Sequence, residues 1–366
     1  MTDNHPTPPA PTPPGAAVPP PAVPPAAAPP AAAPPAAAPP AAVPPVAAPP
    51  AAAPPAAAPA PTPVAPTPEP AATPEEPIVE KRAVWPWIVG AVVLLAAAVL
   101  GSRWWLGTDA GAAFLDRYDG AAPMPADAPV GVPWWASWAH ALNIFLMAGI
   151  IRTGIIVRRE TRPAGYWRPR GKTRPKLTLT TWFHMLIDAL WLLNGVIFVI
   201  LLIVTGQWAR VVPSSWEVFP NALSAGLQYA SLDWPTHDSW IHYNGLQQLM
   251  YFAVIFIAAP LAIVSGLRLS PLWPAKWTFF TKDQARVLHF PVMVFFVVFI
   301  VVHVALVFLT GALTNLNHMF AATNQEGFTG LVMFLVVAVF TGGFVAALRP
   351  SVFAAVARLT GDVSQR

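Results

Sequence analysis

The chain has 366 residues, of which 55% are apolar and only 10% charged, and this composition excludes an ordinary soluble domain. It has no cysteine, which excludes disulfides, thiolate-bound iron–sulfur clusters, cysteine zinc sites and covalently attached c-type haem. The net charge of +4 would suit nucleic acid, but membrane topology explains the basic residues better, so we expect no nucleic-acid partner. Histidine is then the main residue type left to hold a metal or haem.

The first 80 residues differ in kind from the rest of the chain. Between Pro24 and Pro55 the unit Pro-Pro-Ala-Ala-Ala recurs with small variations. Proline at this density prevents helices and sheet ladders, and alanine offers little surface to bury. The sequence predicts a disordered, extended cytoplasmic tail over residues 1–80, which acts as a spacer or as a docking site for a proline-reading partner.

Six apolar segments follow, each close to the twenty residues that cross a bilayer. We expect an all-α integral membrane protein, with an additional anchor, a four-helix core over 137–310, a C-terminal span and a cytoplasmic tail over 349–366. The predicted spans are 84–101, 137–157, 182–206, 245–267, 286–310 and 328–348. The first begins too far from the N-terminus to be an ordinary cleaved signal peptide.

Basic residues are concentrated in alternate connections between the spans. The loop between the second and third spans alone holds eight, against one acid, Glu160. The basic residues on this side are Lys81, Arg82, Arg158, Arg159, Arg162, Arg168, Arg170, Lys172, Arg174, Lys176, Arg268, Lys276, Lys282, Arg286, Arg349, Arg358 and Arg366. The positive-inside rule places this side, with both termini, in the cytoplasm of a bacterial plasma membrane.

Two histidines lie on the fifth span, His289 near its inner end and His303 toward its outer half. Fourteen residues of helix rise by roughly 21 Å and return to nearly the same face. The predicted topology places His184 near the inner face and His140 near the outer face. The four histidines therefore form two depth-matched pairs, His184 with His289 and His140 with His303.

Such pairs are what two six-coordinate haems in a helical bundle require, because each iron takes one axial imidazole from each side of the porphyrin. We therefore expect two b-type haems, with the iron bound by these four histidines. A single membrane histidine is more often a hydrogen-bonded packing residue. A histidine metal cluster is a further alternative, although the two levels are too far apart for one ion site.

These residues resemble the di-haem cytochrome b subunits of the prokaryotic cytochrome b561-like group, the membrane anchors of formate dehydrogenase, nickel–iron hydrogenase and thiosulfate reductase. The resemblance covers residues 137–310, about half of the chain. It implies the same pairing, His140 with His303 and His184 with His289. It also implies a molybdenum or hydrogenase-type partner subunit. The tail and the additional first span depart from the family pattern.

Three charged residues in or near the spans are candidate supporting groups. Arg286 lies one turn before His289, and Arg152 lies toward the inner end of the second span. Either arginine could pair with a haem propionate, or simply anchor the span at the lipid interface. Asp188 lies one turn beyond His184, where it could bond an axial imidazole, move protons or pair with Arg152.

The outer segment from Gln228 to Gln248 mixes aromatic residues with amides. Amide donors at the lipid boundary suit a quinone head group, so Asn244, Gln247 and Gln248 are candidate quinone-binding residues, with His242 behind them. An ordinary interfacial loop is the simpler interpretation. His237, His242 and His318 are expected to be solvated or interfacial, and His5 lies in the tail.

The sequence thus favours a membrane cytochrome b that moves electrons between the quinone pool and a partner oxidoreductase. It carries no signature of substrate chemistry, so we expect an electron-transfer subunit rather than the catalytic one. One alternative is a stand-alone b561-type transmembrane reductase. Another is a haem-free membrane scaffold or transporter whose histidines bind protons or metal.

Overall fold

The computed structural model of the chain describes residues 84–171, 176–235 and 238–365. The predicted tail over 1–80 lies outside these residues, as do Lys81, Arg82, Lys172, Arg174, His237 and Arg366. The described part is mostly helical and contains six helices long and apolar enough to cross a membrane, as predicted. They are α1 (Trp85–Leu106), α3 (Trp134–Arg159), α4 (Leu179–Val204), a broken helix over Gly245–Leu269, α9 (Lys282–Leu309) and α11 (Thr329–Ala347).

The fourth span is not a single α-helix. It consists of α7 (Gly245–Phe252), a π-helical segment η1 (Ala253–Ala258) and α8 (Ala259–Leu269). A second π-helical segment, η2 (Asn317–Ala321), follows the short helix α10 (Ala312–Leu316). A π-turn inserts one residue and so rotates the side chains before it relative to those after it.

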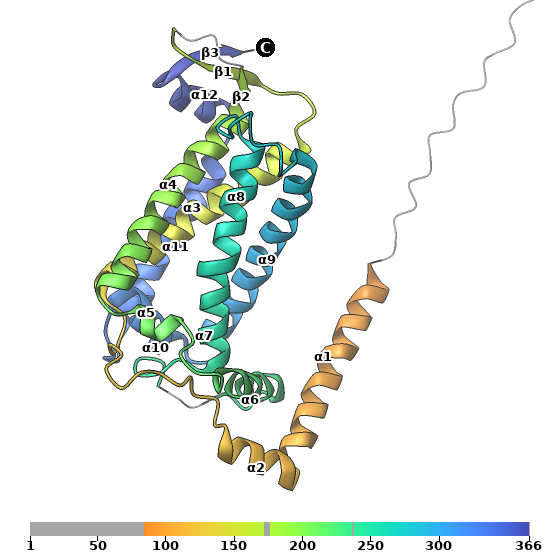
Figure 1. The fold of residues 1–366 in the computed structure, drawn as a ribbon, viewed down its shortest axis with the longest axis vertical. Coiled ribbons are helices and arrows are strands. Elements are labelled where there is room, and N and C mark those ends of the chain that lie inside the picture. Colours follow the sequence, from red (N-terminus) through yellow and green to blue (C-terminus); the bar gives the residue numbers. More distant parts are fainter. Residues whose placement is uncertain (1–83, 172–175, 236–237, 366) are drawn as a thin grey trace, which may run out of the picture. The chain divides into compact units, whose positions relative to one another are not determined.

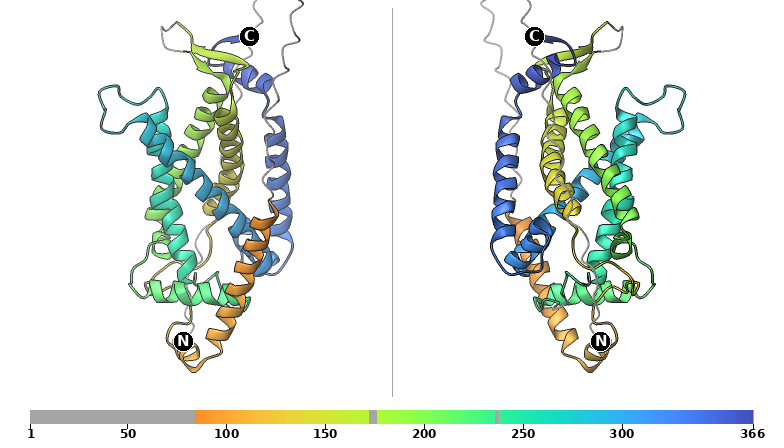
Figure 2. Two further views of the ribbon diagram at one scale, coloured as in Figure 1. Left: turned by 90° about the vertical axis from the view of Figure 1, so that its right-hand side faces the viewer. Right: turned by 90° about the vertical axis from the view of Figure 1, so that its left-hand side faces the viewer.

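The central helices form two sets of close neighbours (Figures 1 and 2). In one set α3 packs against both α4 and α11, and in the other α8 packs against α9. Met147 of α3, Ala258 of η1 and Phe296 of α9 share one buried cluster, which joins the two sets. This arrangement brings α3, α4 and α9, the helices that carry the four spaced histidines, around a common interior.

A small sheet covers one end of the bundle. Its strands β1 (Gly165–Pro169), β2 (Leu177–Thr178) and β3 (Gly361–Gln365) are antiparallel in the order β2-β1-β3. The adjoining helix α12 (Pro350–Arg358) packs on α4, where Phe353 lies against Phe183. The sequence predicted a tail after the last span, but Pro350–Gln365 instead forms α12 and β3.

The opposite end carries shorter helices: α2 (Asp109–Arg117), α5 (Trp208–Val211), α6 (Val218–Ser231) and α10 (Figure 1). The loop between α8 and α9 lies at the sheet end. Most of the described basic residues outside the spans therefore lie at the sheet end, whereas Arg117 of α2 and Arg210 of α5 lie at the opposite end. Following the predicted orientation, we call the sheet end the inner end and the opposite end the outer end.

Helix boundaries follow local capping chemistry. The Thr281 hydroxyl accepts the Gln284 N–H at the start of α9, and the Gln284 side chain accepts the Thr281 N–H in return. The Thr178 hydroxyl accepts the Thr181 N–H and caps α4. These caps fix where α4 and α9 begin, and hence the depth of the histidines that follow.

Candidate haem site

The two rings of the outer histidine pair lie near each other. His140 lies six residues into α3, and His303 lies six residues before the end of α9. Their ring centroids are 6.3 Å apart, and the ring planes stand at 80°. Phe320 of η2 lies 5.8 Å from the His140 ring, and Phe299 stacks on His303 at 5.5 Å. Both histidines are half-buried.

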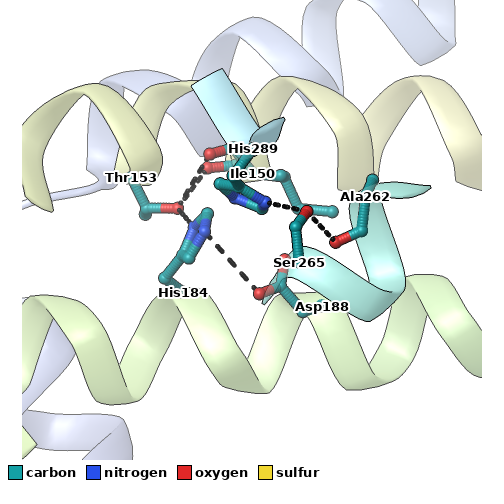
Figure 3. A network of polar contacts seen from close by, with 8 residues as sticks. Ile150, Thr153, His184, Asp188, Ala262, Ser265 and His289 are labelled. Carbon is teal, nitrogen blue, oxygen red and sulfur yellow. Dashed lines mark hydrogen bonds and ion pairs between the residues drawn. The ribbon is translucent and has the colours of Figure 1, made fainter. Parts of the chain in front are cut away.

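The inner pair lies near the other end of α9. His184, in the second turn of α4, and His289 of α9 are close enough to interact electrostatically (Figure 3). Each ring is held by a hydroxyl from a neighbouring helix. The Nδ1 atom of His184 lies 2.8 Å from the Thr153 hydroxyl of α3, and that of His289 lies 2.9 Å from the Ser265 hydroxyl of α8.

Glycines leave room for the inner rings. A Cβ at Gly154 would lie 3.3 Å from Cε1 of His184, and a Cβ at Gly266 would lie 3.4 Å from Cε1 of His289. A methyl group would be slightly tight against His184 at Gly154 and in ordinary contact with His289 at Gly266. The dipeptides Thr153-Gly154 and Ser265-Gly266 therefore lie in a similar way against His184 and His289.

Asp188 borders the inner level. Its Oδ2 lies 3.6 Å from Nε2 of His184, one turn earlier on α4 (Figure 3). This distance exceeds a hydrogen bond, so the ring nitrogen that faces Asp188 is not bonded to it. The carboxylate also interacts electrostatically with His289. Asp188 thus turns toward the histidines, and no ion pair joins it to Arg152 among the described contacts.

The ring separation of the outer pair can be compared with that of two histidines bound to one iron. With a metal–imidazole bond of about 2 Å and a ring centre roughly 1 Å beyond the nitrogen, two axial rings on one iron have centroids about 6 Å apart. The outer pair meets this distance. Within the described residues, no three His, Cys, Asp or Glu side chains are grouped to hold a bare metal ion. Two histidines at each level are the donors that a protein can supply to a haem iron.

The two candidate propionate partners occupy different surroundings. Arg152 of α3 is exposed. Arg286 is exposed as well, and its Nη1 donates to Oδ1 of Asp283, one turn earlier on α9, at 2.6 Å. Arg286 therefore already has a carboxylate partner on its own helix, and an interfacial anion would compete with Asp283.

The three candidate quinone residues lie at the outer start of α7. Asn244 and Gln247 form the capping box of this helix, and Asn244 Nδ2 also donates to the Tyr229 hydroxyl at 2.8 Å. Burial raises the pKa of Tyr229, and the bond from Asn244 acts in the opposite direction. Gln248 is fully buried, and its Nε2 donates to the Arg210 carbonyl while its Oε1 has no partner.

A comparison with protein families decides the identity of the chain. The model of the prokaryotic cytochrome b561 family matches residues 131–322, slightly more than half of the chain, and the match includes all four histidines. The chain belongs to this family. It is therefore a multi-pass membrane protein of the cytochrome b class, whose members carry electrons with b-type haem. No curated protein and no solved structure matches the chain.

Sequence reasoning missed several residues around the site of this cytochrome. His318 was expected to be solvated or interfacial, but that was wrong, because it is buried beneath Trp240 with its ring centroid 5.1 Å away. Its Nε2 lies 2.6 Å from Oδ1 of Asn324, and its Nδ1 lies 3.3 Å from the Ser239 hydroxyl. His242, by contrast, is exposed.

Arg210 is a second missed residue of the outer end. It is 1% exposed, and its guanidinium donates to the carbonyls of Pro129, Ser239 and Trp240 at 2.9–3.0 Å. It also lies over the ring of Tyr243. A buried cation with several carbonyl acceptors fastens the loop before α3 to the loop before α7. A single arginine in an outer loop carries no sequence signal for this role.

Proposed function

We propose that this cytochrome carries two b-type haems, one at each level, and passes electrons between the quinone pool and a partner oxidoreductase subunit. The observation that carries the proposal is the arrangement of four histidines on three helices as an inner and an outer pair. Two histidines bound to each haem iron would exclude other ligands, which would favour electron transfer over oxygen chemistry. Bound haem would supply one-electron redox chemistry at each level.

The residues of the chain would hold and orient these groups. His140 and His303 would ligate the outer haem, and His184 and His289 the inner one. Arg152 and, in competition with Asp283, Arg286 would meet propionates at the inner interface. The rise between His289 and His303 would set the two levels roughly 21 Å apart along α9, so electrons would cross most of the apolar layer in one step between haems.

We further propose that the chain is the membrane subunit of a larger enzyme in the bacterial plasma membrane, with both termini in the cytoplasm. The resemblance to anchors of formate dehydrogenase and nickel–iron hydrogenase supports a molybdenum or hydrogenase-type partner. Quinone exchange is proposed at the outer start of α7. Of the three amides there, Gln248 is the strongest candidate, because its Oε1 has no partner and could accept a hydrogen bond from a quinol hydroxyl, while Asn244 and Gln247 cap the helix.

The proposal is tested with purified protein reduced first by duroquinol and then by dithionite. We expect b-type absorption bands that duroquinol reduces in part and dithionite reduces fully, and co-purification with a redox subunit. Gln248→Leu should slow reduction by duroquinol at least tenfold while leaving the dithionite-reducible haem unchanged, and Gln325→Leu, an exposed amide on the same side, should have no effect. Protein that purifies from haem-replete cells without a Soret band would refute the function.

A further inference from the structure

The same polar contact occurs twice at the inner level. On α3, the Thr153 hydroxyl lies 2.7 Å from the Gly149 carbonyl and 2.8 Å from Nδ1 of His184. On α8, the Ser265 hydroxyl lies 2.6 Å from the Leu261 carbonyl and 2.9 Å from Nδ1 of His289. Figure 3 shows the two hydroxyls, from different helices, each turned to its own imidazole.

These contacts determine which ring nitrogen carries the proton. A hydroxyl has one proton to donate, and a carbonyl oxygen can only accept. Oxygen–oxygen distances of 2.6 and 2.7 Å are those of a hydroxyl donating to the carbonyl four residues earlier. The hydroxyl oxygen can then only accept from the imidazole. Nδ1 of both rings must therefore be the N–H, which leaves the lone pair of Nε2 free.

We propose that Thr153 and Ser265 are positioning residues that hold His184 and His289 in the Nδ1–H tautomer and make the inner haem the lower-potential one. The inference rests on the proposed function, because it concerns haem ligation by the inner pair. An imidazole that donates its second N–H becomes a more basic ligand, which stabilises ferric iron over ferrous iron.

The outer pair differs in this respect. Among the described residues, neither His140 nor His303 has a hydrogen bond from its ring, and their neighbours are the aromatic rings of Phe320 and Phe299. The outer imidazoles therefore lack the fixed acceptor that makes the inner ones more basic. We therefore expect the two haems to have unequal midpoint potentials. Electron transfer from the inner haem to the outer haem would then be energetically downhill.

The test is a redox titration of the haem spectrum in variants of the two hydroxyls. Thr153→Val and Ser265→Ala remove the acceptor with little change in volume. Each should shift the lower-potential component to a more positive midpoint, with a larger shift in the double variant, and leave the higher-potential component in place. Thr153→Ser and Ser265→Thr keep the hydroxyl, so the lower-potential component should retain its native midpoint.

A control is available at the C-terminal cap of α4. The Thr205 hydroxyl makes the same bond to the carbonyl four residues earlier, Leu201, at 2.6 Å, but contacts no histidine. Thr205→Val should therefore leave both midpoints unchanged. A destabilised fold is recognised by loss of both haems and a lower melting temperature, without a selective shift in one midpoint.

The outcomes separate this inference from the proposed function. The inference is overturned if protein with two haems keeps both midpoints in Thr153→Val and Ser265→Ala. It is also overturned if the shifted component is the one that disappears in His140→Ala. A protein that binds no haem would instead remove the proposed function itself.

Discussion

At the residue scale, the histidines of this cytochrome differ in the hydrogen-bond partners of their ring nitrogens. His184 and His289 each have Nδ1 beside a hydroxyl and no hydrogen bond at Nε2, although Asp188 lies 3.6 Å from Nε2 of His184. His318 has polar partners at both nitrogens, Ser239 and Asn324, and packs under Trp240. His318 is therefore a structural residue, although it lies only two positions from Phe320, which contacts His140.

We predict that His318→Ala lowers stability without removing haem. Leaving two buried polar partners unpaired and opening a cavity should cost about 1–3 kcal/mol. The melting temperature, followed by loss of the Soret band, should fall while the haem-to-protein ratio stays at the wild-type value.

The exposed His242 provides the control for this prediction. His242→Ala should change neither the melting temperature nor the haem content, because its side chain is open to solvent. If His318→Ala cost the protein one haem, His318 would have to be reclassified as part of the haem site.

The contrast between predicted and missed residues has a physical basis. His289 and His303 were found because helical periodicity alone places them on one stripe. Thr153 and Ser265 were missed because their partners, His184 and His289, come from other helices, and only packing reveals which helices are neighbours. The matching dipeptides Thr153-Gly154 and Ser265-Gly266 were visible in the sequence, but nothing local marks them as paired with histidines.

At the element scale, the six predicted spans agree with the observed helices within a few residues, because long apolar runs at membrane length leave little ambiguity. The π-helical breaks η1 and η2 were not predicted, since an inserted turn residue has no local sequence signature. The strands β1 and β3 were also missed. Strand β3 is a short polar segment that pairs with β1, almost 200 residues earlier in the chain. Local sequence therefore does not indicate it.

At the scale of the whole molecule, the charge pattern and the fold support one orientation. The described basic loops, the sheet and α12 share the end of the bundle that the positive-inside rule places in the cytoplasm. Because the chain has no cysteine, single-cysteine variants can be labelled without background.

We predict that a membrane-impermeant maleimide labels Ser214→Cys but not Ser364→Cys in right-side-out vesicles. Both side chains are exposed, Ser214 at the outer end and Ser364 on β3 at the inner end. Detergent should make both reactive, which controls for local accessibility. The reverse pattern would place the sheet outside the cytoplasm and invert the assignment of inner and outer haems.

The central claim is that imidazoles from different helices meet in two specific pairs. It is tested most directly by measuring haem per chain in four purified variants, His140→Ala, His303→Ala, His184→Ala and His289→Ala. We expect two haems in the wild type and one in each variant. The same haem should remain, by spectrum and midpoint, in both variants of a pair. Two haems retained in both single variants of a pair, or losses that group His140 with His184, would contradict it.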